Sequence, residues 1–209
     1  MTHLYRGLPL RNIECMMYSF AHHLGKPLAY DGERNGRHIH DIRPDLSRRD
    51  EPTSFGMRDL GLHTEMAFHR VRPTYVLLFC IKNDGTTKTT FSSSKKILDG
   101  LDASTRHTLS LPLYKIHPPR SYTLPYPAFW KPVLYHKNSL AFAEHCFTEF
   151  QTEEARKAYI RMVSRAHQYK EGIVLEPGDL LMIDNRTTVH GRSSIDPSSS
   201  RWLKRLYVL

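Results

Sequence analysis

Two residues separated by a single position have the side chains of a divalent-metal site. His63 and Glu65 occur in the stretch LHTE, and on an extended chain residues i and i+2 face the same side, so one ion can contact both. Roughly one His-x-acid pair is expected by chance in a chain this rich in histidine. Taken alone, the pair is therefore better explained as a surface histidine beside a solvated glutamate.

A distant segment supplies a third ligand and a cation. His190 lies 190 − 63 = 127 residues after His63, in a VHGR stretch where we expect an apolar strand to deliver it to a turn at Gly191. Two histidines and a carboxylate on one face form the facial triad of non-haem Fe(II) oxygenases, which leaves positions open for a 2-oxoacid and O₂. Arg201, 201 − 190 = 11 residues later, has the planar guanidinium that best binds the distal carboxylate of 2-oxoglutarate.

The elements that must position these residues are mostly short strands. Helical spacing of apolar residues indicates a helix at 13–24, which ends at Gly25 and Pro27, and Thr152 is the expected N-cap of a helix at 152–166. The polar, Gly- and Pro-containing stretch 32–58 is expected to be a loop. Strands are expected at 74–81, 89–93, 173–175, 180–184 and 201–209. This pattern predicts a mainly β fold, a sandwich or barrel with helices on its outside.

The composition is that of a single globular domain, 1–209. The chain has 209 residues, of which 40% are apolar and 24% charged, as is ordinary for one domain. No apolar run is long enough for a transmembrane helix, and the first residues lack the apolar segment of a secretory signal, so we expect a cytoplasmic protein. Cys15, Cys80 and Cys146 stand among apolar residues and are expected to be buried, reduced thiols.

The net charge of +9 raises the question of an acidic partner. A basic excess is compatible with nucleic acid, with an acidic substrate or with a solvated surface. The thirty Lys and Arg residues are dispersed, and no basic run with interleaved aromatic residues occurs, which argues against nucleic acid. The charge alone does not separate the other two explanations.

Other polar and aromatic residues have simpler explanations than chemistry. Trp130 and Trp202 are expected to pack in the core or at its rim. Asp184 and Asn185, at the end of a predicted strand, are expected to organise the loop before His190, and either is suited to hydrogen-bond that histidine. Eight histidines show no ligand spacing and are expected to be structural or exposed: His22, His23, His38, His107, His117, His136, His145 and His167.

Two long stretches that contain these motifs resemble the clavaminate synthase-like branch of the taurine dioxygenase (TauD) superfamily. They are LGLHTEMAFHRVRPTYVLLFCIKNDG, and EPGDLLMIDNRTTVHGRSS with the later RWLKRLYV. The segment GKPLAYDGERNGRHIHDIRP is similar to the one that precedes the branch's HxE motif, so the resemblance covers about residues 24–209. It implies a double-stranded β-helix, that is, a jelly-roll or cupin-like core, which uses Fe(II), 2-oxoglutarate and O₂. It also implies hydroxylation of an unactivated C–H bond of an amino acid or amino-acid-derived intermediate, as in antibiotic and other natural-product biosynthesis.

The resemblance assigns the cofactor site position by position. Arg201 matches the residue that anchors 2-oxoglutarate, and Thr89, with Thr90 as the alternative, matches a hydroxyl near the cosubstrate. The iron ligands of the family match His63, Glu65 and His190. Because Glu65 is present, halogenation is disfavoured, since related halogenases lack this carboxylate.

Four further positions match substrate-contacting residues of the family. Arg205 matches the residue that takes an acidic group of the substrate, and Thr53 matches a hydroxyl position. His40 stands where amino-acid hydroxylases commonly have a glutamine for the α-amine. Glu144 is the only acid in LAFAEHC, where arginine hydroxylases have two aspartates. The last departure argues against an arginine-like substrate.

The chain also departs from the family in length, and the outcome of the reaction stays open. Family members usually have many more residues before the first metal ligand, so residues 1–23 are not expected to cover the sheet fully, and a homodimer is one way to bury it. Desaturation, cyclisation and epimerisation use the same iron chemistry as hydroxylation. Two further alternatives are a jelly-roll binding protein without turnover and a nucleic-acid demethylase that would use the net charge of +9.

Overall fold

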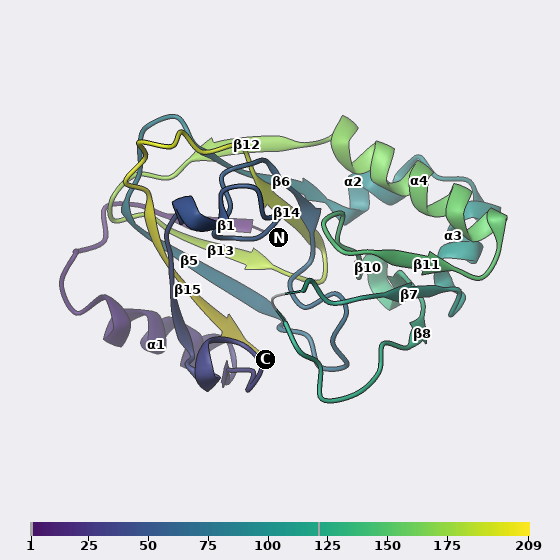
Figure 1. Cartoon of the computed structure of the whole chain (residues 1–209), viewed down its shortest axis with the longest axis horizontal. Coiled ribbons are helices and arrows are strands. Elements are labelled where there is room, and N and C mark those ends of the chain that lie inside the picture. The colour runs from purple at the N-terminus through teal and green to yellow at the C-terminus, as the bar shows by residue number, and fades with distance from the viewer. Residues whose placement is uncertain (1, 121) are drawn as a thin grey trace.

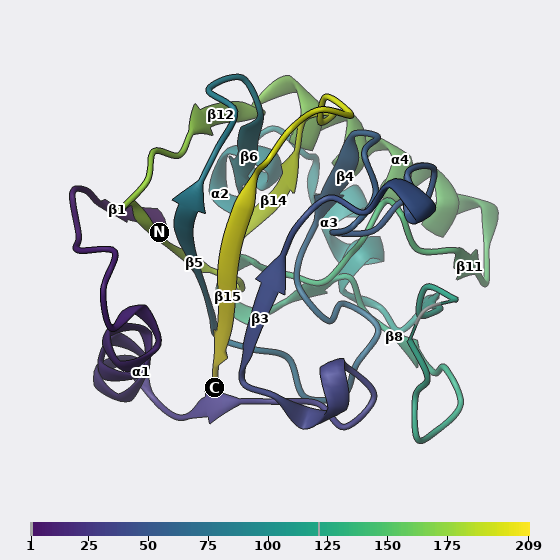
Figure 2. The ribbon, with the colours of Figure 1, turned by 60° about the vertical axis from the view of Figure 1, so that its left-hand side comes forward.

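Two antiparallel sheets form the centre of the molecule. The structure is a computed structural model that describes residues 2–120 and 122–209. In the larger sheet the strand order is β1 (Thr2–Tyr5), β13 (Leu180–Asp184), β5 (Tyr75–Lys82), β15 (Trp202–Val208) and β2 (Pro27–Leu28), with β3 (Ile39–Ile42) also paired to β15. In the smaller sheet the order is β12 (Glu171–Val174), β6 (Lys88–Ser93), β14 (Thr188–Arg192) and β4 (Leu60–His63). The two sheets face one another as in a jelly roll (Figures 1 and 2).

The remaining elements lie at the edges and outside. Short strands form two small sheets, β11 (Thr148–Phe150) with β7 (Tyr114–Ile116) and β8 (Trp130–Lys131), and β9 (Leu134–Tyr135) with β10 (Ser139–Leu140). The helices are α1 (Ile13–Leu24), α2 (Ser94–Asp99), α3 (Ala103–Ser110) and α4 (Glu153–Gln168). Figure 1 shows α2, α3 and α4 together at one end of the molecule, away from α1. No helix in the described part of the chain is both long and apolar enough to cross a bilayer.

Successive side chains of β5 point to opposite faces of the larger sheet, and apolar residues cover both faces. Val76 and Leu78 point into the core between the sheets, whereas Leu77 and Phe79 belong to a second buried cluster that contains Met17 of α1. Successive side chains of a strand point to opposite faces, so a continuous apolar run fills both layers. The helix at 13–24 thus covers the outer face of the larger sheet.

The same alternation orients the metal motif in the smaller sheet. Leu62 of β4 and Val189 of β14 are buried on its outer face, in a cluster with Met162 of α4. Their neighbours His63 and His190 therefore point the other way, into the space between the sheets. Helices α2 to α4 hold this sheet from behind, so the histidines are presented from a rigid support.

The mainly β jelly-roll fold is confirmed, together with the helix at 13–24 and the strand at 180–184. Strand β3 falls in the stretch expected to be a loop, and helices α2 and α3 were not predicted. Gly191 forms no turn, since it lies inside β14. Cys15 is exposed, so the expectation of a buried thiol was wrong there; it holds for Cys80 and Cys146. Cys15 occupies a solvent-facing position of α1, next to Glu14, although Met16 and Met17 follow it in the sequence.

Candidate metal centre and cosubstrate pocket

His63, Glu65 and His190 come together between the two sheets. His63 ends β4 and pairs directly with His190 in the register of β4 and β14, which brings the two rings to a centroid distance of 4.5 Å. Glu65 lies two residues beyond His63 on the same side of the chain. One nitrogen or oxygen from each residue lies within 4.8 Å of the other two. The three side chains are buried, with 6%, 9% and 4% of their surface exposed.

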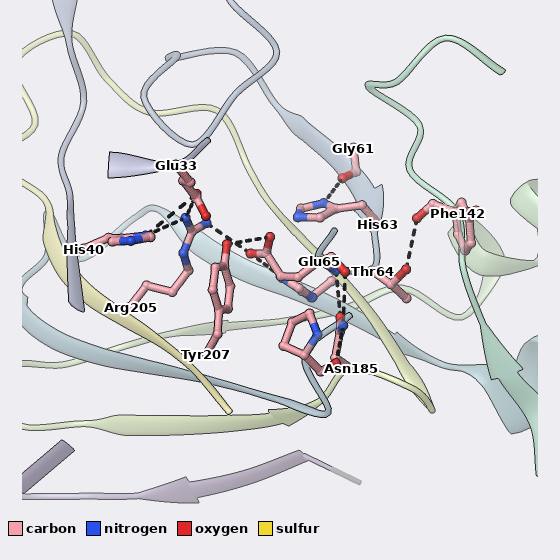
Figure 3. Close-up of polar contacts among 12 residues, drawn as sticks. Glu33, His40, Gly61, His63, Thr64, Glu65, Phe142, Asn185, Arg205 and Tyr207 are labelled. Carbon is pink, nitrogen blue, oxygen red and sulfur yellow. Dashed lines mark hydrogen bonds and ion pairs between the residues drawn. The ribbon is translucent and has the colours of Figure 1, made fainter. Parts of the chain in front are cut away.

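Local hydrogen bonds orient the His63 ring. Its Nδ1 lies 2.9 Å from the Gly61 carbonyl oxygen (Figure 3). A carbonyl can only accept, so Nδ1 carries the proton and Nε2 is left with a free lone pair. Burial, then the nearby His190 and His145, lower the pKa of His63 well below its usual value. The ring is therefore neutral at physiological pH, as a metal ligand must be.

Four contacts hold Glu65 in place. Its carboxylate accepts from Arg205 Nη1 at 3.2 Å and from the Tyr207 hydroxyl at 3.1 Å, as Figure 3 shows. Its backbone N–H donates to Asn185 Oδ1 at 2.7 Å, and its carbonyl accepts from Asn185 Nδ2 at 3.2 Å. Burial by itself would raise the pKa of Glu65, but Arg205 and the hydrogen-bonded His190 outweigh it and hold the pKa well below its usual value. Glu65 is therefore a fixed, ionised carboxylate.

This donor set fits a divalent non-haem iron. Two imidazole nitrogens and one carboxylate on one face of a site are the ligands of Fe(II) oxygenases that react with a 2-oxoacid and O₂. His63 and Glu65 approach from the β4 end, and His190 approaches from β14. The other side of the group faces a cavity of about 280 Å³ that all three residues line.

Arg201 lies in the same cavity and has an unpaired donor. Its Nη2 donates to Thr89 Oγ1 at 3.3 Å. This hydrogen bond connects the two residues that the sequence analysis assigned to the cosubstrate. Its Nε is buried without a hydrogen-bond partner in the described chain. Burial, then the nearby Arg192, lower the pKa of Arg201 to about 10, so the group stays cationic at neutral pH. A buried cation with an unused donor suits the distal carboxylate of 2-oxoglutarate.

Two of the predicted substrate residues, Arg205 and Thr53, also line the cavity. The Arg205 guanidinium contacts both Glu65 and Glu33, two partners that the sequence did not indicate. Glu33 lines the cavity as well and was not identified from the sequence. His40 is buried behind Arg205, with its Nδ1 at 3.2 Å from Arg205 Nη2, and it does not line the cavity in the described chain.

Glu144 points away from the cavity, whereas the next residue, His145, lines it. The Glu144 carboxylate pairs with His167 at 2.8 Å and does not line the described cavity, whereas His145 does. The His145 ring meets the His63 ring edge-on at a centroid distance of 4.8 Å. His145 therefore lines the cavity beside His63, a position that the sequence did not indicate. No spacing in the sequence signals it, because its approach to His63 depends on how residues 141–146 cross the end of β4.

Asn185 supports a different metal ligand from the one expected. Its side chain holds the backbone of Glu65 and the Pro73 carbonyl oxygen, the latter at 2.9 Å. His190 Nδ1 is buried and has no hydrogen-bond partner in the described residues, so Asn185 does not orient His190. The expectation that Asp184 organises the loop is met, since its Oδ1 accepts from the Arg186 N–H at 3.0 Å.

Curated relatives resemble this chain over most of its length. The L-asparagine oxygenase of Streptomyces coelicolor (strain ATCC BAA-471 / A3(2) / M145) is 33% identical over 196 residues, which is 89% of this chain and 58% of that protein. Clavaminate synthase 2 of Streptomyces clavuligerus is 28% identical over 215 residues, or 94% of this chain and 64% of that protein. The chain thus spans less than two thirds of the length of either relative.

Solved structures and a family model give the same relationship. A structure of asparagine oxygenase with Fe(II), 2S,3S-3-hydroxyasparagine and succinate matches with a TM-score of 0.91 at 29% identity, over 100% of this chain and 74% of that one. The non-haem iron oxygenase OrfP with Fe and alpha-ketoglutaric acid matches with a TM-score of 0.87 at 26% identity, over 99% and 74%. The model of the taurine catabolism dioxygenase TauD, TfdA family matches residues 16–207. Because that match contains both metal motifs and the trailing arginine, the chain belongs to this family.

Proposed function

We propose that this protein is an Fe(II)- and 2-oxoglutarate-dependent dioxygenase that hydroxylates a C–H bond of an amino acid or an amino-acid-derived intermediate. The observation that carries the proposal is the buried His63, Glu65 and His190 group, with ligand atoms within 4.8 Å, in one cavity with Arg201. Bound Fe(II) supplies the oxidation of the C–H bond by O₂, with conversion of 2-oxoglutarate to succinate and CO₂. Relatives named as amino-acid oxygenases and hydroxylases support the same reaction class.

The chain's own residues position the reactants. Arg201, with Thr89 bonded to it, holds the distal carboxylate of the cosubstrate and thereby directs its 2-oxoacid end toward the ligands. Arg205 and Tyr207 keep Glu65 ionised and fixed. Apolar side chains that line the same cavity exclude water from the reacting atoms; they include Met66, Phe68, Leu78 and Leu203.

An amino-acid zwitterion fits the charges on the far side of the cavity. Arg205 is cationic and lines the cavity, so it remains our proposed ligand of the substrate carboxylate. Glu33 pairs with Arg205 and also lines the cavity, so we assign it to the substrate ammonium. The two partners are opposite in sign, as the two ends of an amino acid require. Thr53 and His145 are left to contact the side chain of the substrate.

The reaction is tested by turnover with a panel of amino acids. Purified protein with Fe(II), 2-oxoglutarate and O₂ is incubated with L-asparagine, L-lysine, L-ornithine and L-arginine, the amino acids in the relatives' names, and succinate and hydroxylated product are measured. We expect succinate formation that depends on one of these or a related amino acid. Wild type should bind one Fe(II) per chain, and His63→Ala and His190→Ala should not bind it. Equal iron binding by wild type and both variants would contradict the metal assignment.

Glu33→Gln tests the amino-acid site separately from the metal. Loss of the carboxylate removes a charge-assisted contact to the ammonium and should raise KM about 10- to 100-fold, as expected for 1.4–3 kcal/mol. Fe(II) and 2-oxoglutarate should bind as in wild type, because Glu33 touches neither Arg201 nor the metal ligands other than through Arg205. Glu153→Gln, a change of the same kind on α4, serves as the control. An unchanged KM with turnover retained would remove Glu33 from the site and leave the reaction class intact.

We also propose a location and a choice of partners for the enzyme. We expect a cytoplasmic enzyme, which cell fractionation tests, that binds a small substrate and does not bind nucleic acid. A homodimer, one way to cover the larger sheet, is to be measured by sedimentation. Salt-dependent binding to oligonucleotides would contradict the expectation about nucleic acid.

A further inference from the structure

A second cavity, of about 390 Å³, lies beside the residues that precede β5 and shares no described lining residue with the metal cavity. Its lining consists of cationic and aromatic side chains with one proline. No carboxylate is among the described residues that line it. The side chains that matter for its chemistry are His69, Arg70, Arg72, Phe129, Tyr135 and Arg186.

Three arginines of this cavity have no acidic partner in the described chain. Arg72 is the most buried; its Nη1 donates to the Leu140 carbonyl at 2.7 Å, and its guanidinium lies 5.2 Å from the Tyr135 ring centroid. The Arg186 guanidinium donates to the Thr74 hydroxyl at 2.8 Å. Arg70 lies over the Tyr126 and Phe129 rings. None of the three arginines forms an ion pair with a described Asp or Glu.

The charges of Arg72 and Arg186 oppose one another. Burial lowers the pKa of Arg72; the nearby Tyr135 raises it, and the charge of Arg186 lowers it. Like charges that line one cavity repel, and an anion placed between them relieves the repulsion. The side chains are held by carbonyl and hydroxyl acceptors and by aromatic faces, so the site is formed before any ligand enters.

We propose that this cavity binds a phosphate-bearing small molecule. A phosphate group carries up to two negative charges and three strong acceptor oxygens, which matches three guanidiniums that bind oxyanions in a planar, bidentate manner. Phe129 and Tyr135 provide flanking aromatic surface for the organic part of the ligand. The cavity is larger than a phosphate ion needs, so the ligand carries more than the phosphate alone.

The cavity contacts the segments that position the metal ligands. Arg72 Nη1 lies 3.5 Å from the hydroxyl of Thr64, the residue between His63 and Glu65. The carbonyl of the next residue, Pro73, accepts from Asn185, whose side chain also holds Glu65. Arg186 directly follows Asn185. A ligand in the cavity therefore stiffens the backbone behind the metal centre, although it does not touch the metal ligands.

Titration with inorganic pyrophosphate tests the proposal by isothermal calorimetry at constant ionic strength, since screening would otherwise change with ligand concentration. Wild type should bind it saturably, with one site per chain. Arg70→Gln and Arg186→Gln change exposed side chains, so both variants should fold, and each should bind about tenfold more weakly because a charge-assisted contact is lost. Arg156→Gln, on α4, is the matched control and should bind as wild type. Inorganic phosphate and adenosine monophosphate then report whether the organic part adds affinity.

A further variant distinguishes binding in this cavity from binding at the metal centre. Pyrophosphate also has access to the arginines of the metal cavity, so binding is repeated with Arg201→Gln, which should leave the affinity unchanged. Hydrogen–deuterium exchange should slow on addition of pyrophosphate in peptides that contain residues 66–75 and 183–188. The proposal is overturned if wild type shows no saturable binding, if both Arg70→Gln and Arg186→Gln bind like wild type, or if only Arg201→Gln loses binding.

Discussion

Arg201 is a buried cation whose anionic partner is missing from the described chain. Burial, and then the charge of the buried Arg192 beside it, lower the pKa of Arg201, and its Nε has no partner in the described chain. Burial of an uncompensated charge is costly, and a site that contains one is completed by an anion. The contact between Arg201 and Thr89 leaves the guanidinium directed into the cavity.

Replacement of Arg201 by alanine should therefore weaken 2-oxoglutarate binding and leave iron binding intact. Loss of a bidentate charge-assisted contact costs about 2–4 kcal/mol, which is about 30- to 1000-fold in affinity. Anaerobic calorimetry of the Fe(II) form with 2-oxoglutarate measures the change. Arg43→Ala removes the same charge from the exposed surface beside Trp202 and should have no such effect. If Arg201→Ala binds 2-oxoglutarate as tightly as wild type, Arg192 is the residue to change next.

At the scale of elements, the approach of β4 to β14 decides whether His63 and His190 can share an ion. The two histidines are register partners, and the register shifts between His190 and Arg192. Gly191 lies at this irregularity. A Cβ there would stand 2.4 Å from the Leu60 carbonyl oxygen and 3.1 Å from that of Gly61. A side chain at this position would therefore push the two strands apart.

Gly191→Ala should consequently reduce both stability and iron binding. Backbone atoms cannot move aside as a flexible side chain can, so we expect a loss of about 1–3 kcal/mol in the free energy of unfolding. Iron binding should weaken because His63 moves away from His190. Gly172→Ala on β12 is the control, since its closest contact would be the flexible Lys88 side chain at 3.3 Å, and it should change stability by about 0.5 kcal/mol or less. Chemical denaturation and iron titration of both variants measure the free energy of unfolding and the iron affinity. Equal values for Gly191→Ala and Gly172→Ala would show that β4 tolerates the added methyl group.

At the scale of the whole molecule, some of the basic side chains are buried in the interior. Lys131 is only 4% exposed and its Nζ donates to the Ala67 carbonyl. Burial, then the nearby Arg72, lower the pKa of Lys131 to about 7. The ordinary lysine pKa is 10.5, so between these two values the unfolded chain holds a proton that the folded chain has released. Stability must then rise with pH across this interval.

Lys131→Met should remove this part of the pH dependence. In wild type the contribution of Lys131 to the free energy of unfolding should increase between pH 7 and 9 by up to about 1.4 kcal/mol per pH unit. The variant lacks the titrating group, so its stability should follow a flatter curve over the same interval. Urea denaturation of both proteins at pH 7, 8 and 9 gives the two slopes. Parallel curves would show that Lys131 keeps its ordinary pKa in the folded protein.

Local order in the sequence determined the metal motif and much of the fold. His63 and Glu65 share one side of an extended chain because the side-chain period of a strand is two residues, and no tertiary information is needed to see it. The alternation in 74–81 and the helical spacing in 13–24 are equally local, and both elements form close to where they were expected. His190 and Arg201 followed from the order of residues after the first motif, and the family resemblance then assigned each of them a role.

Tertiary structure alone decided which distant residues complete the cavity. Glu33 meets Arg205 across 172 positions, and Asn185 holds Glu65 across 120. His145, and not Glu144, lines the cavity, because the Glu144 side chain turns toward His167. Strand β3 forms in a polar stretch since β15 offers it an edge to pair with. The physical reason is common to these cases: strand register and loop crossings bring together groups whose separation along the chain carries no periodic signal.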